Sequence, residues 1–254
     1  MPRRRVALVL ILALGILCLR VRSDSAGFAR PTRMAALPRL TLWAWERPSD
    51  LSDVDPGSTA VAYLALTVRV HQSAVAFPRL QPLVIPVDPR LTLIPVVRIE
   101  TASGSVLDDA TAEAAATEIA GAMRPGAAAL QVDFDARLSE RGWYRKVLTE
   151  LRHELPAKVP LSITALASWC SNDRWMQGLP VDEAVPMYFR MEPDRRITPT
   201  TLDEYKIREP LCADSVGVST TEPWPDSYVG KRVYVFSDRG WRVDSIGAVE
   251  RRAE

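Results

Sequence analysis

The sequence is poor in the residues that most often build metal and cofactor sites. Its 254 residues include only two histidines and three cysteines, and neither His71 nor His153 stands at ligand spacing from a cysteine. No glycine-rich phosphate loop follows a predicted strand, and no Gly-x-Ser-x-Gly segment is present. The sequence therefore predicts no metal and no cofactor, and it disfavours nucleotide binding and serine hydrolase chemistry.

An excess of one charge is also missing. Lys and Arg total 32 against 31 for Asp and Glu, which gives a formal net charge of +1. Proteins that bind nucleic acids usually carry a basic face, so the balance predicts no nucleic-acid partner. Apolar residues make up 47% of the chain, which is enough for one sizeable core.

A long uninterrupted apolar run occurs only at the N-terminus. Residues 6–19 are apolar, with basic residues 3–5 before them and Arg20 and Arg22 after them. This pattern is typical of a signal peptide, and the run is shorter than the roughly 20 residues that span a bilayer. We expect residues 1–22 to be a signal peptide or membrane anchor, residues 23–38 a linker and residues 39–248 the folded domain.

This organisation predicts an exported protein, either periplasmic or held at the outer face of the cytoplasmic membrane, that meets the membrane only through its N-terminal segment. Cys170 and Cys212 would then be an even pair in an oxidising compartment, which permits a disulfide without establishing one. The two could equally lie at opposite ends of the fold.

Eight short apolar runs follow residue 39. They have the length of strands, and several are rich in Val and Ile, as buried parallel strands are. The runs are residues 40–45, 59–66, 93–99, 129–134, 161–166, 184–189, 215–219 and 233–236. Helical patterns at 109–123, 139–155 and 201–208 alternate with some of them. The alternation predicts an α/β fold with a parallel sheet, and eight strands predict a (β/α)8 TIM-type barrel.

Three features predict a small, degenerate barrel rather than a regular one. The first two runs, and likewise the last two, are separated by too few residues for a full helix. Pro95 and Pro186 lie inside predicted strands, where each removes a hydrogen-bond donor. Residues 77–96 contain five prolines, which indicates an irregular extended excursion. An open doubly wound sheet is the alternative fold.

Charged and aromatic residues follow many of the predicted strands. In a parallel barrel the carboxyl ends of the strands share one face, which normally holds the active site. The residues that we expect to bind substrate there are Trp45, Glu46, Arg98, Glu100, Trp169, Arg190 and Trp224. Flat apolar rings beside carboxylates suit sugars, although core packing is the alternative role for each tryptophan.

Asp133 and Asp135 are the sharpest catalytic candidates, and Glu222 is the third. Asp133 and Asp135 are two residues apart on a strand, so their side chains point the same way and their like charges should raise one pKa. Glycoside hydrolysis uses two carboxylates of unlike pKa. We expect Asp135 to be the nucleophile or orienting carboxylate, Glu222 the general acid and Asp133 the tuning residue. The structural alternative is that Asp135 caps a helix and Asp133 pairs with Arg98.

Five segments carry a resemblance to a known family. Residues 42–48 (LWAWERP), 97–100 (VRIE), 131–137 (QVDFDAR), 162–170 (SITALASWC) and 185–187 (VPM) resemble a bacterial family of unknown function that is placed among glycoside-hydrolase-like TIM barrels. The resemblance covers about residues 39–240. It implies the barrel and makes a polysaccharide or oligosaccharide the expected partner.

The segment at 130–137 also resembles, more distantly, the acidic strand motif Asp-x-x-Asp-x-Asp-x-Glu of chitinase-type hydrolases. Asp133 and Asp135 match its second and third acids. Leu130 takes the place of the first Asp, and Arg137 takes the place of the catalytic Glu. A proton donor would therefore have to come from another strand, which is the reason for choosing Glu222.

Three functions remain open. The first is a glycoside-hydrolase-like protein that acts on or binds a cell-envelope polysaccharide. The second is a non-catalytic glycan-binding or scaffold barrel, which the missing Glu favours. The third is a Mg²⁺-dependent phosphohydrolase that uses the Asp-x-Asp pair.

Overall fold

The computed structural model describes residues 33–171, 173–189 and 206–253. Residues 31–254 form one compact unit. The predicted leader, residues 1–22, lies outside the described residues, as does Arg190. The predicted helix at 201–208 is described only in its last three residues, which are not helical.

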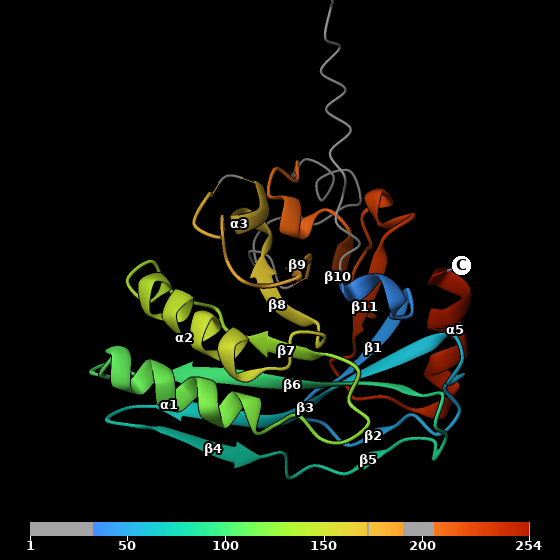
Figure 1. Ribbon diagram of the computed structural model, residues 1–254. Helices are drawn as coiled ribbons and strands as arrows, with labels where there is room; N and C mark the ends of the chain where they lie inside the picture. Colours follow the sequence, from blue (N-terminus) through green and yellow to red (C-terminus); the bar gives the residue numbers. More distant parts are fainter. Residues whose placement is uncertain (1–32, 172, 190–205, 254) are drawn as a thin grey trace, which may run out of the picture. The chain divides into compact units, whose positions relative to one another are not determined.

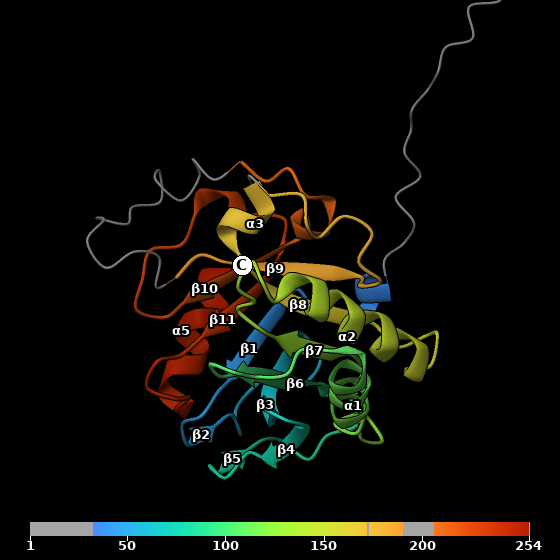
Figure 2. The same ribbon diagram turned by 90° about the vertical axis from the view of Figure 1, so that its left-hand side faces the viewer.

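Eight parallel strands close into a barrel (Figures 1 and 2). In order around the barrel they are β1 (Leu40–Ala44), β3 (Thr59–Val70), β6 (Thr92–Thr101), β7 (Leu130–Asp133), β8 (Leu161–Leu166), β9 (Glu183–Met187), β10 (Ser215–Ser219) and β11 (Arg232–Phe236). The barrel closes because β1 pairs with both β3 and β11. Each predicted strand overlaps one of these, so the predicted barrel is confirmed and the open sheet is excluded.

Among the described residues, full helices cover only part of the barrel. The helices α1 (Asp109–Ala120) and α2 (Arg141–Glu154) lie side by side against the outer face of the strands around β7 (Figure 1). They match two predicted helices, and Asp108 begins α1 with a capping box to Thr111. The helix α5 (Val243–Ala253) packs near β1 and β11 and was not predicted. It continues beyond residue 248, the expected limit of the domain.

No full helix lies between β1 and β3 or between β10 and β11, as predicted. The shorter described elements are η1 (Arg33–Ala36), β2 (Ser49–Asp50), β4 (Ala74–Pro78), β5 (Leu83–Val84), α3 (Ala167–Ser171), η2 (Pro210–Cys212) and η3 (Asp226–Tyr228). The strand β4 pairs antiparallel with the end of β3, and only its last two residues fall within the expected excursion, residues 77–96. Pro186 is tolerated because β9 and β10 pair at a single register position, Met187 with Gly217.

A buried polar network fills the amino-terminal end of the barrel interior. The Glu183 carboxylate accepts hydrogen bonds from Arg232 Nη1 at 3.0 Å and from the Tyr234 hydroxyl at 2.8 Å. Arg232 also donates to the carbonyl oxygens of Met34 and Pro38. The described part of the expected linker, residues 33–38, therefore packs against the barrel floor, and Met34 is buried.

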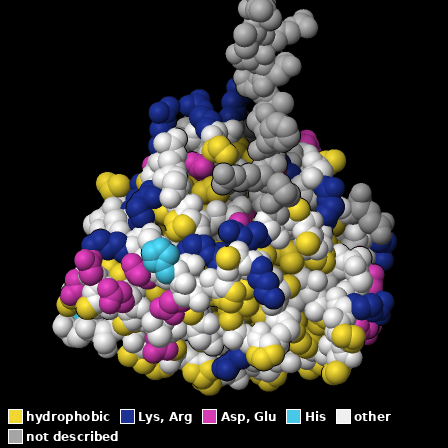
Figure 3. Space-filling model, viewed as in Figure 1, with side chains coloured by type: hydrophobic (Ala, Val, Ile, Leu, Met, Phe, Trp, Pro, Cys, Tyr) yellow, Lys and Arg dark blue, Asp and Glu magenta, His cyan; other side chains and the backbone are white. Residues whose placement is uncertain are grey.

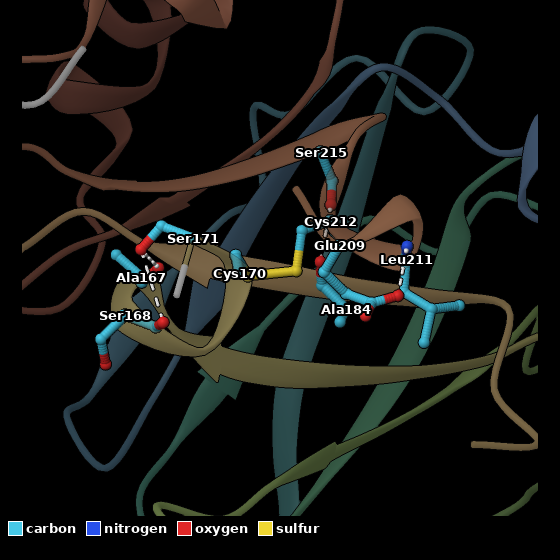
Figure 4. Close-up of a disulfide and its surroundings, with 9 residues drawn as sticks. All are labelled: Ala167, Ser168, Cys170, Ser171, Ala184, Glu209, Leu211, Cys212 and Ser215. Carbon is cyan, nitrogen blue, oxygen red and sulfur yellow. Dashed lines mark hydrogen bonds between the residues drawn. A yellow bond between two sulfur atoms is a disulfide. The ribbon is translucent and has the colours of Figure 1, made fainter. Parts of the chain in front are cut away.

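Cys170 and Cys212 form a disulfide that ties α3 to η2 (Figure 4). Their Cα atoms are 5.9 Å apart. The backbone N–H groups of Arg208 and Glu209 both donate to the Cys170 carbonyl, at 2.8 and 3.1 Å. The cysteines meet because the chain around η2 packs beside β9, which the strand pattern alone could not indicate.

Candidate functional site at the carboxyl end of the barrel

Asp133 is partly buried at the mouth of the barrel. Along β7, Leu130 and Val132 pack into the outer cluster with α1 and α2, so Gln131 and Asp133 point into the barrel. The Thr164 hydroxyl on β8 donates to Asp133 Oδ1 at 2.7 Å. Burial, and secondarily the charge of Asp135, raises the pKa of Asp133 to about 6, while the Thr164 bond and the Arg98 charge act in the opposite direction.

Asp135 lies two residues beyond Asp133, the last residue of β7, and is the more exposed of the two carboxylates. Its pKa is raised mainly because neighbouring protein displaces water, and the Arg98 charge opposes this shift. The helix α2 begins after Glu140, not after Asp135, so the helix-capping alternative for Asp135 is wrong. The charge of Asp135 raises the pKa of Asp133 as expected, although burial raises it more.

Arg98, Glu100 and Trp45 surround the aspartates. Arg98 stands opposite Asp133 in the register of β6 and β7, and its Cζ lies 5.8 Å from the centre of the Trp45 ring. Arg98 Nε is 3.3 Å from Glu100 Oε1, and Arg69 Nε donates to Glu100 Oε2 at 3.1 Å. Arg69 was not predicted. The sequence predicted that this strand ends at residue 66, whereas β3 continues to Val70 and so includes Arg69.

Two of the predicted sugar-binding tryptophans are core residues. Trp169 is 2% exposed and Trp224 is 3% exposed. Trp169 packs edge to face with Trp175, with ring centres 4.9 Å apart. Trp224 donates to the Ser219 carbonyl at 2.9 Å, and the Arg252 guanidinium covers its ring at 4.1 Å. Neither offers an open face, so burial contradicts stacking on sugars, whereas Trp45 is only partly buried.

The other predicted residues are dispersed. Glu222 is partly buried just after β10, and β8 and β9 separate β10 from β7 in the sheet. Its role as general acid stays a prediction. Glu46 is exposed after β1, where its charge acts on Arg79.

Arg137, which takes the place of the catalytic Glu in the chitinase-type motif, lies in a turn. Arg137 is exposed, and its backbone N–H donates to Glu140 Oε2 at 2.7 Å. Glu140 is itself buried and accepts from the Thr101 hydroxyl at 2.7 Å. Sequence reasoning missed Glu140, which holds the loop between β7 and α2 against the end of β6.

Within the described residues, no group of three or more His, Cys, Asp and Glu side chains is arranged to hold a metal ion. The positive charge of Arg98 lowers the pKa of both Asp133 and Asp135, against the effect of burial. No described helix is long and apolar enough to cross a membrane.

The fold has known counterparts. No family model matches the chain, and no curated protein matches it. Among solved structures, the "putative Chitinase A" from Streptomyces coelicolor superposes over 85% of this chain and 95% of its own, with a TM-score of 0.54 and 13% identity. The chain therefore shares the barrel fold of this structure.

Two other structures match smaller parts of the chain. The chitinase domain of the spore coat protein CotE from Clostridium difficile matches 59% of the chain with 14% identity and a TM-score of 0.42. The spore cortex-lytic enzyme SleL from Bacillus cereus matches 71% with 16% identity and a TM-score of 0.47. The chain spans 49% and 50% of these two proteins, respectively. Likeness at such identities establishes the fold and not the activity.

Proposed function

We propose that this is a glycoside-hydrolase-like protein that binds a polysaccharide of the cell envelope at the carboxyl end of its barrel. The observation that carries the proposal is the position of Asp133 and Asp135. One carboxylate with a pKa of about 6 lies beside a more open one, at the end of the barrel where such folds place their sites. Trp45 and Arg98 supply an aromatic face and a hydrogen-bond donor next to them.

In the hydrolytic form of the proposal, Asp135 faces the reacting sugar, and Asp133 tunes the acidity of Asp135. Glu222 supplies the proton. The charge of Arg98 favours the ionised form of Asp135, because it opposes the rise in pKa that burial causes. Export is also part of the proposal, and it is supported by the basic and apolar pattern of residues 1–22.

A non-catalytic glycan-binding barrel is the second candidate, and one observation favours it. The place of the catalytic Glu in the chitinase-type motif is held by Arg137, within a turn fixed by Glu140. Such a barrel would retain the sugar contacts of the rim without the proton donor on the same strand.

The test uses residues 31–254, because this compact unit includes the segment that packs under the barrel floor. The purified protein is incubated with a panel of bacterial polysaccharides, and both released reducing ends and retained glycan are measured, with and without EDTA. Asp135→Asn and Glu222→Gln are compared with Asp244→Asn, whose side chain is 75% exposed on α5.

Release that the first two variants abolish, that Asp244→Asn leaves intact and that EDTA does not affect is the result expected of a two-carboxylate glycosidase. Retention without release selects the binding barrel. Release that EDTA removes would contradict a metal-independent mechanism with two carboxylates. A protein that neither retains nor cleaves any glycan would refute the proposal for that panel.

A further inference from the structure

Three strands next to the candidate site extend beyond the rest of the barrel. The strands β3 and β6 have 12 and 10 residues, whereas their parallel neighbours β1 and β7 have 5 and 4. β6 pairs with β7 only as far as Arg98 and Asp133, but it continues alongside β3 to Thr101. β4 adds a third strand to this extension through its antiparallel pairing with residues 66–70 of β3.

The two faces of the extension have different environments. Val68, Val70, Val97, Ile99 and Ala74 belong to the buried cluster under α1 and α2. Side chains alternate along a strand, so the intervening residues point to the opposite face. We call that face the rim wall, and its residues are Thr67, Arg69, Val75, Phe77, Arg98 and Glu100.

The rim wall is continuous with the candidate site. The strand registers place Phe77, Thr67, Arg98 and Asp133 in one row across four strands. A second row, one step further along the strands, contains Val75, Arg69 and Glu100. Thr67 is buried, so a polymer lying on Asp135 could continue along the second row, over Glu100, Arg69 and Val75.

Apolar surface is exposed at the far end of the rows. Val75 is 47% exposed and Phe77 is 43% exposed, which is unusual for large apolar side chains in a strand. The Arg69 guanidinium lies 4.8 Å from the centre of the Phe77 ring. More apolar side chains, Leu80, Val84 and Val87, are exposed further along the excursion, and Figure 3 shows hydrophobic side chains along the lower edge of this view, over β4 and β5.

The six residues of the rim wall include two arginines and one carboxylate, and the two aspartates of the candidate site lie beyond Arg98. Arg69 and Arg98 share one carboxylate, that of Glu100, and both reach it through Nε. In the described part of the chain the Nη atoms of these two arginines make no hydrogen bond. Their side chains are 61% and 37% exposed. A guanidinium with free Nη groups is suited to paired hydrogen bonds with a carboxylate.

We propose that the rim wall is an additional binding surface for the same polysaccharide, and that this polysaccharide carries carboxylate groups. Arg69 and Arg98 bind a sugar carboxylate, and Val75 and Phe77 contact the apolar side of a sugar unit further along the chain. The inference rests on the proposed function, because the rows begin at Asp133. It adds the substrate class, an acidic glycan, and the direction of the bound chain across β6, β3 and β4.

The experiment measures the affinity of residues 31–254 for polygalacturonate, alginate and hyaluronan, and for the same polymers after chemical reduction of their carboxyl groups. Arg69→Gln is the test variant. Arg90→Gln is the matched control, because Arg90 is 67% exposed and is also paired with one acid, Asp88, but lies before the start of β6. Phe77→Ala tests the apolar end of the wall, and Asp135→Asn tests the candidate site.

We expect the native protein to bind at least one acidic polymer about tenfold more tightly than its reduced form, as the loss of a charged hydrogen-bonded pair implies. Arg69→Gln should remove most of that preference, Phe77→Ala should weaken binding to both forms, and Arg90→Gln should change neither. Binding to the reduced polymers that needs Asp135 but is insensitive to Arg69→Gln would overturn the inference and leave the proposed function standing. Binding to none of the polymers would overturn the inference together with the glycan-binding proposal.

Discussion

Replacing Asp133 with Asn should stabilise the protein in a pH-dependent way. The pKa of Asp133 is about 6 in the folded protein and 3.8 by itself. The folded state therefore binds more protons than the unfolded state between about pH 4 and pH 6, and the free energy of unfolding falls as the pH rises through that range. The pKa difference corresponds to about 3 kcal/mol lost by pH 8.

Asn keeps the shape of the side chain, and its Oδ1 can still accept the hydrogen bond from Thr164. Asp133→Asn should thus match the native protein at pH 4 and exceed its free energy of unfolding by about 3 kcal/mol at pH 8. The assay is urea unfolding followed by tryptophan fluorescence at pH 4, 6 and 8, with Asp244→Asn as an exposed control. A difference that is the same at all three pH values, or a loss of stability at pH 8, would refute the reasoning.

Three further changes have expected outcomes of their own. Glu183→Ala should lower the free energy of unfolding in urea by about 3–5 kcal/mol, because it leaves the buried Arg232 charge without its partner. The control Glu113→Ala, at an exposed position on α1, should lower it by less than about 0.5 kcal/mol. Equal losses for the two variants would contradict a stabilising role for the Glu183–Arg232 pair. Cys170→Ser should lower the free energy of unfolding by about 4 kcal/mol, since the disulfide closes a loop of 42 residues, and dithiothreitol should lower the melting temperature of the native protein but not of the variant. Gly240→Ala should lower the melting temperature far more than Gly104→Ala, although both glycines have positive φ. A Cβ at Gly240 would lie 2.2 Å from the Pro48 carbonyl oxygen, whereas one at Gly104 would meet nothing within 4 Å. Similar melting temperatures for the two variants would show that the loop around Gly240 moves aside.

The eight strands could be predicted because each combines several apolar, often β-branched, residues in a run of strand length. Residues 161–166 and 215–219 were predicted with the observed bounds. The strand β4 was missed because Ala74–Pro78 adjoins a proline-rich segment and is half exposed. The helix α5 was missed because its first turn follows Gly240 and Trp241 with no clear capping residue, and it buries only Ile246 and Val249.

The candidate site could be predicted only in part. Asp133 and Arg98 were found because strand-end residues of a parallel barrel share one face. Burial of Trp169 and Trp224 could not be predicted, because a tryptophan next to a strand end suits a binding face and a core equally well. Arg69 became recognisable only with the register, since the sequence does not tell how far β3 continues beyond the barrel.

The position of β1 between β3 and β11 has a consequence for the synthesis of the protein. Its hydrogen-bonding partners on one side are made shortly after it, but those on the other side, residues 233–236, come much later in the chain. A chain still emerging from the ribosome or a translocation channel would hold β1 with one open edge until β11 has been made. Contacts so far apart in sequence form slowly and leave strand edges free for aggregation. The barrel should therefore close only after β11 has been synthesised, and chains truncated within β11 should be insoluble rather than form a smaller soluble domain.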